Sequence, residues 1–405
     1  MPNMKNSYIN QISDSALNLP IGFSSLGKEL AKIESVAGKE MPEAVAFYAG
    51  RIVESLSQRA LLQSNLRHGI SLEINLNLLS QWGKIDQGTF AIGNMIRRIS
   101  NQARHMDRAI DTYEEPTIIG LLQLWVEWFL ENFSTERKGS IDSGIGAADW
   151  SNRTPFIRTL VRGDVKEMEL SLAAHKFDQI FQADPTLACF TGERLIDSKS
   201  ALANDFTKKI KVIFPKSQRV TQIRALYFSR NSNPHQAVYL LKSLTGLTRV
   251  DAETFGILGG AYKNIWADSH DHQYLQRSYE QYEKGVHSSP DDYYLRINLA
   301  ATALWLGDRD TSRAQSNKVL QVLAKFGVAV DDKNQITPSY WALATIAEAN
   351  FLAEKYAKAV TLYEQLAKLD SSGGRWIRTA QQLKVHLEKL KDDNVRETFA
   401  AILNT

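Results

Sequence analysis

Cysteine and proline are scarce in this chain. Its 405 residues include one cysteine, Cys189, and 10 prolines. A single cysteine excludes an intramolecular disulfide and a metal site built from thiolates, and it suits the reducing cytoplasm, where we expect the protein to reside. Phosphate loops, nucleophile elbows and dinucleotide fingerprints are also lacking. We therefore expect neither a metal ion nor a cofactor.

Net charge of one sign is lacking as well. The 48 Lys and Arg residues nearly balance the 45 Asp and Glu residues, which leaves a formal net charge of +3. This balance excludes a bulk attraction to nucleic acid, so any RNA contact must be local. The longest apolar run, residues 118–133, holds two glutamates and is shorter than the ~20 residues of a membrane span. We expect no membrane contact and interpret the run as a buried or dimer-facing helix.

Helical periodicity is present almost throughout the chain. Four periodic stretches predict a small helical bundle within residues 1–133. The polar segment 134–150 has no period and is interpreted as a linker, with an ordered surface loop as the alternative. Over residues 151–405, paired helical stretches recur every ~35 to 45 residues, as in helical-hairpin repeats, although a series of helix pairs without a true repeat is the alternative. We therefore expect an all-α protein, with an N-terminal bundle followed by an α-solenoid of helix hairpins.

One predicted helix, residues 88–111, carries a chemical signal. Positions seven apart nearly eclipse on a helix and positions four apart share a face, so Arg98, Asn101 and His105 project from one stripe. Imidazole can transfer a proton near neutral pH, and guanidinium can stabilise charge on a phosphate oxygen. The stripe is a candidate catalytic site for metal-independent attack on RNA, with Arg97 and Arg104 as RNA-binding residues. A solvated basic helix face is the alternative.

A second signal lies in the middle of the chain. Asp251-Ala-Glu-Thr-Phe-Gly-Ile-Leu-Gly-Gly-Ala-Tyr-Lys263 is followed by Tyr279-Glu-Gln-Tyr-Glu-Lys-Gly285 and by Pro290-Asp-Asp-Tyr-Tyr-Leu-Arg-Ile-Asn298. These motifs resemble the tetratricopeptide sensor (TPR-S, TRAF-binding-like) domain of bacterial conflict proteins and apoptosis-signalling kinases. The resemblance covers residues 155–370 and implies tetratricopeptide-like hairpins. Asn264 follows Lys263 where that family commonly has arginine.

The glycines of this stretch indicate a close approach. Each glycine inside a helix costs about 1 kcal/mol relative to alanine, so three within five positions favour a neighbouring helix or ligand that comes close. A nucleotide-derived ligand or a protein partner would then bind on the solenoid. The candidate ligand-binding residues are Glu253, Gly256, Gly260, Lys263, Asp292, Tyr293 and Asn298. The alternative is that the glycines serve packing and Asn298 bonds the neighbouring hairpin.

The N-terminal bundle resembles HEPN-like domains with the motif R-x-x-G-N-x-A-x-H, over residues 40–133. Ser100 stands where that family has glycine, and Arg104 is an extra charge. The resemblance implies a ribonuclease that forms a homodimer through the bundle, so that both motifs meet in one cleft. The ribose hydroxyl would attack the adjacent phosphate while His105 moves protons, Arg98 stabilises the phosphorane and Asn101 orients the imidazole.

Three functions are consistent with these patterns. The first is a HEPN-type endoribonuclease, a toxin restrained by the sensor domain in prokaryotic antiviral or stress defence. The second is a dimeric adaptor without enzymatic activity, and the third is a small-molecule sensor that signals to a partner protein. The pairing of Arg98 with His105 favours the first, and the near-neutral net charge favours the other two.

Overall fold

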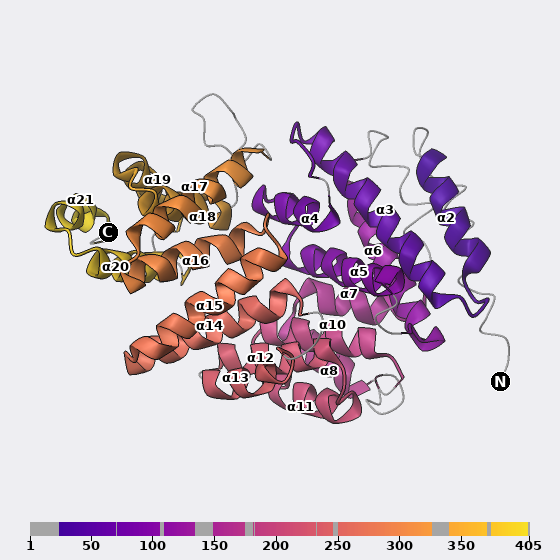
Figure 1. The fold of residues 1–405 in the computed structure, drawn as a ribbon. Coiled ribbons are helices and arrows are strands. Elements are labelled where there is room, and N and C mark those ends of the chain that lie inside the picture. The colour runs from indigo at the N-terminus through magenta and orange to yellow at the C-terminus, as the bar shows by residue number, and fades with distance from the viewer. Residues whose placement is uncertain are drawn as a thin grey trace. The chain divides into compact units, whose positions relative to one another are not determined.

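The structure, a computed structural model, describes residues 24–69, 71–105, 109–133, 149–174, 181, 183–231, 233–245, 250–325, 340–370 and 374–403. Every regular element within these ranges is a helix (Figure 1), which confirms the expected all-α class. None of the described helices is both long and apolar enough to span a bilayer. The contacts between Cα atoms divide the chain into two compact units, Met1–Pro215 and Lys216–Thr405.

The first unit is built around one long helix, α3. Its buried residues Val45, Ala49, Ile52, Val53 and Leu56 recur at the helical spacing. This face packs against α5 and α6, and α2 and α4 also contact α3. The helices of this unit are α2 (Ser24–Val36), α3 (Pro42–Gln63), α4 (Leu72–Gln81), α5 (Gln87–His105), η2 (Thr112–Glu114), α6 (Glu115–Phe133), α7 (Thr154–Arg162), α8 (Val165–Ala174), α10 (Pro185–Asp197) and α11 (Ala203–Ile213).

Helix α6 accounts for the longest apolar run of the sequence. Ile118, Leu122, Trp125 and Phe129 have no exposed surface, and α6 contacts α3, α5 and α7. The run is therefore buried within the first unit. Because the expected homodimer rested partly on this apolar surface, the dimer stays a prediction that has lost one of its arguments.

The first unit continues beyond the expected bundle. Only Asp149 and Trp150 of the expected 134–150 linker lie among the described residues. Trp150 is fully buried, and its backbone N–H donates to Gln123 Oε1 at 2.6 Å. Thr154 Oγ1 donates to the same oxygen at 3.1 Å, and α7 and α10 also contact α5. Trp150, α7 and α10 thus pack onto the bundle, while the expected boundary at residues 133–151 stays a prediction.

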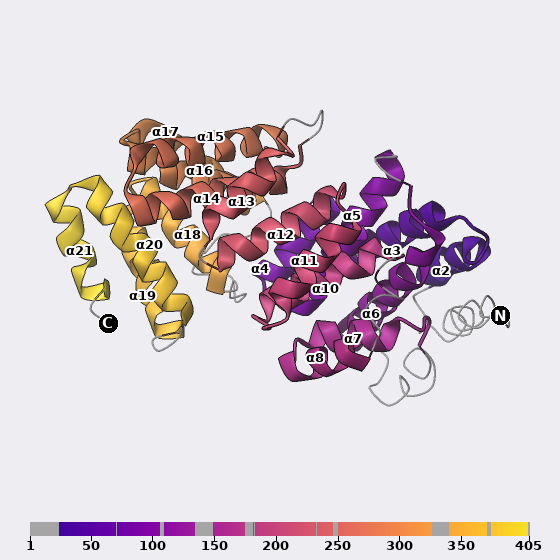
Figure 2. The same cartoon turned by 90° about the horizontal axis from the view of Figure 1, so that it is seen from below.

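Among the described residues, the second unit is a series of five helix pairs. From α12 to α19 each helix contacts the next one along the chain, and α20 contacts α21. Helix α12 also contacts α14, as α16 contacts α18 and α20. In Figure 2, α15 and α17 lie along one side of this unit, with α14, α16, α18 and α20 beneath them. The helices are α12 (Gln218–Arg230), α13 (Pro234–Lys242), α14 (Ala252–Ser269), α15 (His272–Ser288), α16 (Tyr293–Leu306), α17 (Arg309–Lys325), α18 (Tyr340–Leu352), α19 (Tyr356–Leu369), α20 (Gly374–Leu390) and α21 (Asp393–Leu403).

The glycines of α14 admit neighbouring helices. A Cβ atom on Gly259 would lie 3.0 Å from the ring of Tyr282 on α15, and one on Gly256 would lie 3.2 Å from Leu295 on α16. A Cβ atom on Gly260 would lie 3.6 Å from the Tyr282 hydroxyl, an ordinary van der Waals distance. Gly256 and Gly259 therefore serve helix packing, the alternative that the sequence left open.

Candidate functional site

Helix α5 is held tightly against α3 where the motif begins. Ser100 is buried, and a Cβ atom on Gly50 of α3 would lie 2.1 Å from the Ser100 Oγ atom. The absence of a side chain at Gly50 therefore lets the two helices approach at Ser100, the residue that replaces the family glycine. This contact fixes the face of α5 that carries the arginines.

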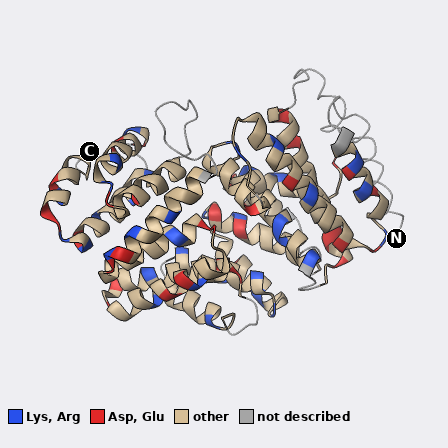
Figure 3. Cartoon of the chain, turned by 45° about the horizontal axis from the view of Figure 1, so that its top comes forward, with Lys and Arg blue, Asp and Glu red and all other residues tan. Residues whose placement is uncertain are grey.

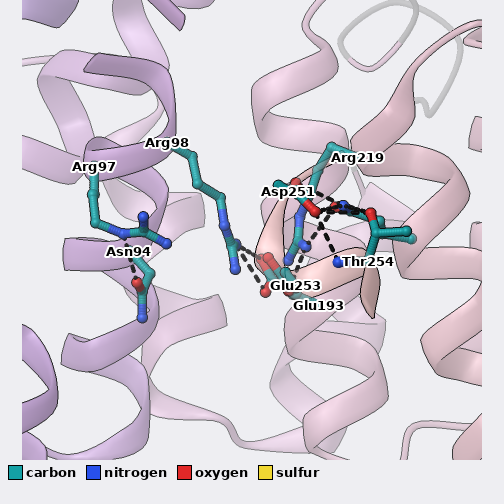
Figure 4. A network of polar contacts seen from close by, with 9 residues as sticks. Asn94, Arg97, Arg98, Glu193, Arg219, Asp251, Glu253 and Thr254 are labelled. Atoms are coloured by element: carbon teal, nitrogen blue, oxygen red, sulfur yellow. Dashed lines mark hydrogen bonds and ion pairs between the residues drawn. The ribbon is translucent and has the colours of Figure 1, made fainter. Parts of the chain in front are cut away.

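Arg98 and Arg97 each contact a carboxylate from another helix, and Figure 4 shows the contact between Arg98 and Glu193. Arg98 Nη1 donates to both oxygens of Glu193 on α10, at 3.1 and 3.2 Å. The two side chains are 19% and 17% exposed, so the pair is largely shielded from water. Arg97 lies 3.4 Å from Glu73 on α4 and donates to Asn94 at 3.2 Å. Both guanidinium groups are therefore engaged within the first unit.

Arg104 makes a looser set of contacts. Its Nη2 atom lies 4.0 Å from Glu54 on α3, and its guanidinium carbon lies 5.5 Å from the centre of the Phe47 ring. Asn101 is half-buried, and His105 is the last residue of α5. The side chain of His105 lies outside the described residues, so the placement of this candidate proton carrier stays a prediction.

The second unit brings Lys263 and Asn298 together. Lys263 Nζ on α14 donates to Asn298 Oδ1 on α16 at 3.0 Å, and it lies 5.8 Å from the centre of the Trp305 ring. Asn298 is 8% exposed, and its Nδ2 atom donates to the carbonyl oxygen of Tyr294 one turn earlier. Burial lowers the pKa of Lys263, although Glu348 partly opposes this effect. Burial therefore disfavours the charged form of this lysine unless an opposite charge comes close.

The other expected ligand-binding residues have local roles. Glu253 lies 2.7 Å from Arg219 of α12, close to hydrogen bonds that join Gln222 to Asp251 (Figure 4). Asp292 is the N-cap of α16, because its side chain accepts a hydrogen bond from the Leu295 N–H at 3.0 Å. Tyr293 is the half-buried first residue of α16. Their assignment as ligand contacts stays a prediction.

Three polar residues that the sequence did not single out contact one another in the second unit, namely Glu348, Gln382 and His386. Glu348 on α18 accepts hydrogen bonds on Oε1 from His386 Nε2 at 2.9 Å and from Gln382 Nε2 at 3.2 Å, both on α20. Burial alone would raise the pKa of Glu348, but the hydrogen bonds from His386 and Gln382 and the charge of Lys263 lower it overall. No local sequence signal marks them, because their contacts join residues 34 and 38 positions apart.

Charges of both signs alternate over the described helices. Figure 3 shows Lys and Arg interspersed with Asp and Glu, as the small net charge suggests. Within the described residues, no group of three or more His, Cys, Asp or Glu side chains could hold a metal ion. The electrostatic features that stand out are therefore individual side chains.

Comparisons with known proteins support the sensor resemblance. Residues 199–304 match the family described as Tetratricopeptide Repeats-Sensor, which confirms the resemblance for that segment. No curated protein matches the sequence. A thermophilic TPR protein of Thermus thermophilus is 15% identical, and the match covers 49% of this chain and 98% of that chain with a TM-score of 0.37. The APC/C hetero-tetramer Cut9-Hcn1 is 10% identical over 94% of this chain and 74% of that chain, with a TM-score of 0.42.

Proposed function

We propose that the protein is a sensor that regulates an effector, and that its signal binds to the face of the second unit that carries Lys263 and Asn298. The observation that carries this proposal is the environment of the Lys263 ammonium group. Its ammonium group is held in poorly solvated surroundings by a neutral amide, and no described residue forms a direct ion pair with it. A desolvated cation of this kind is a typical binding group, because an anionic ligand gains more from it than from a solvated lysine.

A thermal-shift experiment on the full chain tests this proposal. We would heat the wild type and Lys263→Met in the presence of a fractionated low-molecular-weight extract of host cells. A ligand present at about 100 times its Kd stabilises the folded state by about 2.7 kcal/mol. We expect one fraction to raise the Tm of the wild type and not that of Lys263→Met. Lys284→Met, which changes an exposed lysine on α15, is the matched control and should respond as the wild type does.

Two results of the thermal-shift experiment would contradict the proposal. An equal rise in Tm for the wild type and Lys263→Met would place the binding event elsewhere. The absence of any shift with extracts from unstressed, stressed and phage-infected cells would contradict a small-molecule signal. A dimeric adaptor that binds a partner protein would then account better for the chain.

RNA cleavage is a second candidate function, in which the first unit is the effector in prokaryotic antiviral or stress defence. It is favoured by the presence of Arg98, Asn101 and His105 on the single helix α5. In this proposal His105 moves the protons and Arg98 stabilises the phosphorane, within a homodimer. The ion pair between Arg98 and Glu193 argues against an active site in the present conformation, since the guanidinium must leave Glu193 to reach a phosphate.

Expression in a host cell tests the second candidate. Wild type, His105→Ala and the control His287→Ala would be compared for growth and for RNA integrity. Cleavage should persist in EDTA, disappear in His105→Ala and remain in His287→Ala, whose side chain is exposed on α15. The products should end in a cyclic phosphate. Cleavage that persists in His105→Ala, or that needs Mg²⁺, would show that α5 is not the active site.

A further inference from the structure

We propose that Lys263 and Glu348 are the two charged ends of one ligand site, and that this site takes a small molecule that joins an anionic group to a flat, amino-bearing ring. The inference rests on the proposed sensor function. It adds a selecting residue, Glu348, from outside the segment 199–304 that matches the sensor family.

A continuous set of contacts links the two ends across four helices. Lys263 on α14 lies against Trp305 of α16, with 5.8 Å between the ammonium nitrogen and the ring centre. Trp305 Nε1 donates to His386 Nδ1 of α20 at 3.0 Å. His386 Nε2 in turn contacts Glu348 Oε1 of α18 at 2.9 Å. Lys263 and Glu348 are therefore linked through two buried rings, and the charge of Glu348 acts on Lys263.

His386 orients the carboxylate of Glu348. The indole N–H of Trp305 can only donate, so the Nδ1 atom of His386 must accept, and the proton of a neutral imidazole must be on Nε2. That Nε2–H then donates to Glu348 Oε1, and Gln382 donates to the same oxygen. Among the described residues none donates to Glu348 Oε2. One carboxylate oxygen is thus fixed by the protein, and the other can accept a hydrogen bond from a ligand.

The face is accessible and yet poorly solvated. The Glu348 side chain is 18% exposed, and Tyr294 is 55% exposed. Burial nevertheless raises the pKa of the Tyr294 hydroxyl, to which the charge of Glu348 adds. Solvent therefore reaches both side chains, although other protein atoms lie close to them. Charges in such surroundings interact strongly with a ligand that displaces the remaining water.

A buried hydroxyl provides an independent sign of a missing partner. Tyr282 on α15 has no exposed surface, and its hydroxyl has no hydrogen-bond partner among the residues that the structure describes. The ring passes beneath Gly259, and the hydroxyl arrives beside Gly260, one helical turn before Lys263. The charge of Glu348 also acts on this hydroxyl. Buried hydroxyl groups are nearly always hydrogen-bonded, so the Tyr282 hydroxyl is an unsatisfied donor directly beneath Gly260, close to Lys263.

The chemistry of these groups defines the class of ligand. Lys263 uses one hydrogen bond for Asn298 and keeps donors for an anionic group. Tyr294, which lies one turn before Asn298, presents a half-exposed ring on which a flat group can stack. Glu348 Oε2 can accept from an amino group but would repel a keto oxygen at the same place. The site should therefore prefer an amino-bearing ring to its keto counterpart.

Adenosine and inosine 5′-monophosphates test this preference, because they differ by an amino and a keto group. Calorimetric titration of the full wild-type chain should give about 10-fold tighter binding of the amino compound, as for the loss of one hydrogen bond to a charged group. Glu348→Gln should bring the two affinities to within about 3-fold, because an amide can both accept and donate. Glu364→Gln, an exposed carboxylate on α19, is the matched control and should keep the preference.

Two further titrations test the other groups. Adenosine without phosphate and inorganic phosphate alone should each bind more weakly than the monophosphate, and Lys263→Met should abolish the advantage of the monophosphate over adenosine. Tyr294→Leu should weaken both monophosphates equally, because stacking does not distinguish amino from keto rings.

Several outcomes would overturn the inference. These are equal affinities of the wild type for the two monophosphates, a preference that survives in Glu348→Gln, and no binding of either compound at millimolar concentration. If Lys263→Met loses the response to cell extract while the monophosphates bind equally, the sensor function stands and this ligand class is wrong. If the preference depends on Glu348 but Lys263→Met responds normally to extract, the site exists and the proposed function is wrong.

Discussion

The arginines of α5 and the lysine of α14 are both charged groups that the sequence marks as functional, yet their surroundings differ. Arg98 lies 3.1 Å from the carboxylate of Glu193, and Arg97 lies 3.4 Å from that of Glu73. Lys263 instead contacts a neutral amide, and Glu348 contacts a neutral imidazole. A charge with an opposite charge in contact is already stabilised in the free protein. A desolvated charge without one in contact is stabilised less in the free protein and gains more from a ligand that brings the opposite charge.

The largest expected effect on stability comes from Asp184. This buried carboxylate extends the comparison to a charged group whose two oxygens both accept hydrogen bonds from the protein. Its Oδ1 accepts from the Leu187 N–H and its Oδ2 from Thr117 Oγ1, so we regard it as structural. Burial raises its pKa from 3.8 to about 7, against the hydrogen bond from Thr117. A pKa raised in the folded state favours the protonated form, so this stabilisation is complete below pH 3.8 and disappears as the pH rises through about 7.

The unfolding free energy should therefore fall between about pH 4 and pH 7 by as much as about 4 kcal/mol from this group alone. Asp184→Asn keeps an acceptor for Leu187 and has no charge to bury. We expect it to unfold with little dependence on pH over this range and to exceed the wild type in stability at pH 8. Urea denaturation at several pH values measures both. Parallel pH profiles for the two proteins would contradict the assignment.

Gly50→Ala tests whether the arginines of α5 depend on close helix packing. The new Cβ atom would lie 2.1 Å from Ser100 Oγ, so we expect a loss of about 3 kcal/mol of stability, the upper range for overpacking a core. Ser100→Gly in the same chain removes the colliding atoms and should recover most of the loss. Chemical denaturation of the two single variants and the double variant measures this recovery. Additive losses in the double variant would show that the contact between the two residues is not the cause.

Arg98→Met and Lys263→Met compare the two regions directly. Loss of Arg98 removes its ion pair with Glu193, whose side chain is only 17% exposed, and should destabilise the chain by about 2 kcal/mol. Loss of Lys263 removes a poorly solvated charge and should cost less than about 0.5 kcal/mol. Urea denaturation without ligand measures the loss of stability in each variant. Equal losses in the two variants would remove the distinction between the regions.

Arg104→Ala should give the smallest effect. The pair with Glu54 is 4.0 Å long, and both side chains are substantially exposed to solvent. Exposed ion pairs of this kind contribute about 0.5 kcal/mol or less. If the first unit binds RNA, Arg104→Ala should weaken binding and reduce its dependence on salt. A loss of several kcal/mol in stability would show that the contact with Phe47 matters more than we expect.

Much of the fold could be predicted from the sequence, because it depends on local periodicity. Helix pairs were expected over residues 151–405, and α12 to α21 lie within this range. The turn before α21 has no such sequence signal, since it places Lys391 at a φ of 54° instead of using the glycine or proline that marks helix ends. Composition and periodicity therefore suffice to predict helices but not to predict unusual turns between them.

The candidate sites were predicted less well, because they depend on contacts distant in sequence. Arg98 meets Glu193 across 95 positions, and Trp305 meets His386 across 81. The spacing of residues within a sequence motif does not predict contacts between residues so far apart in the chain. The motif residues Lys263 and Asn298 were found, since a family resemblance marks them. Their partners and the engagement of Arg98 needed the three-dimensional structure.

The central claim is that Lys263 and Glu348 serve a ligand and not the stability of the fold. The most direct test is the unfolding free energy of Lys263→Met/Glu348→Gln in the absence of ligand. This variant removes both poorly solvated charges and keeps an acceptor for His386 Nε2. We predict that its stability equals or exceeds that of the wild type, as is common when binding residues are replaced. A loss of more than about 2 kcal/mol, the size expected for breaking a buried polar network, would show that the two charges are structural and would contradict the account.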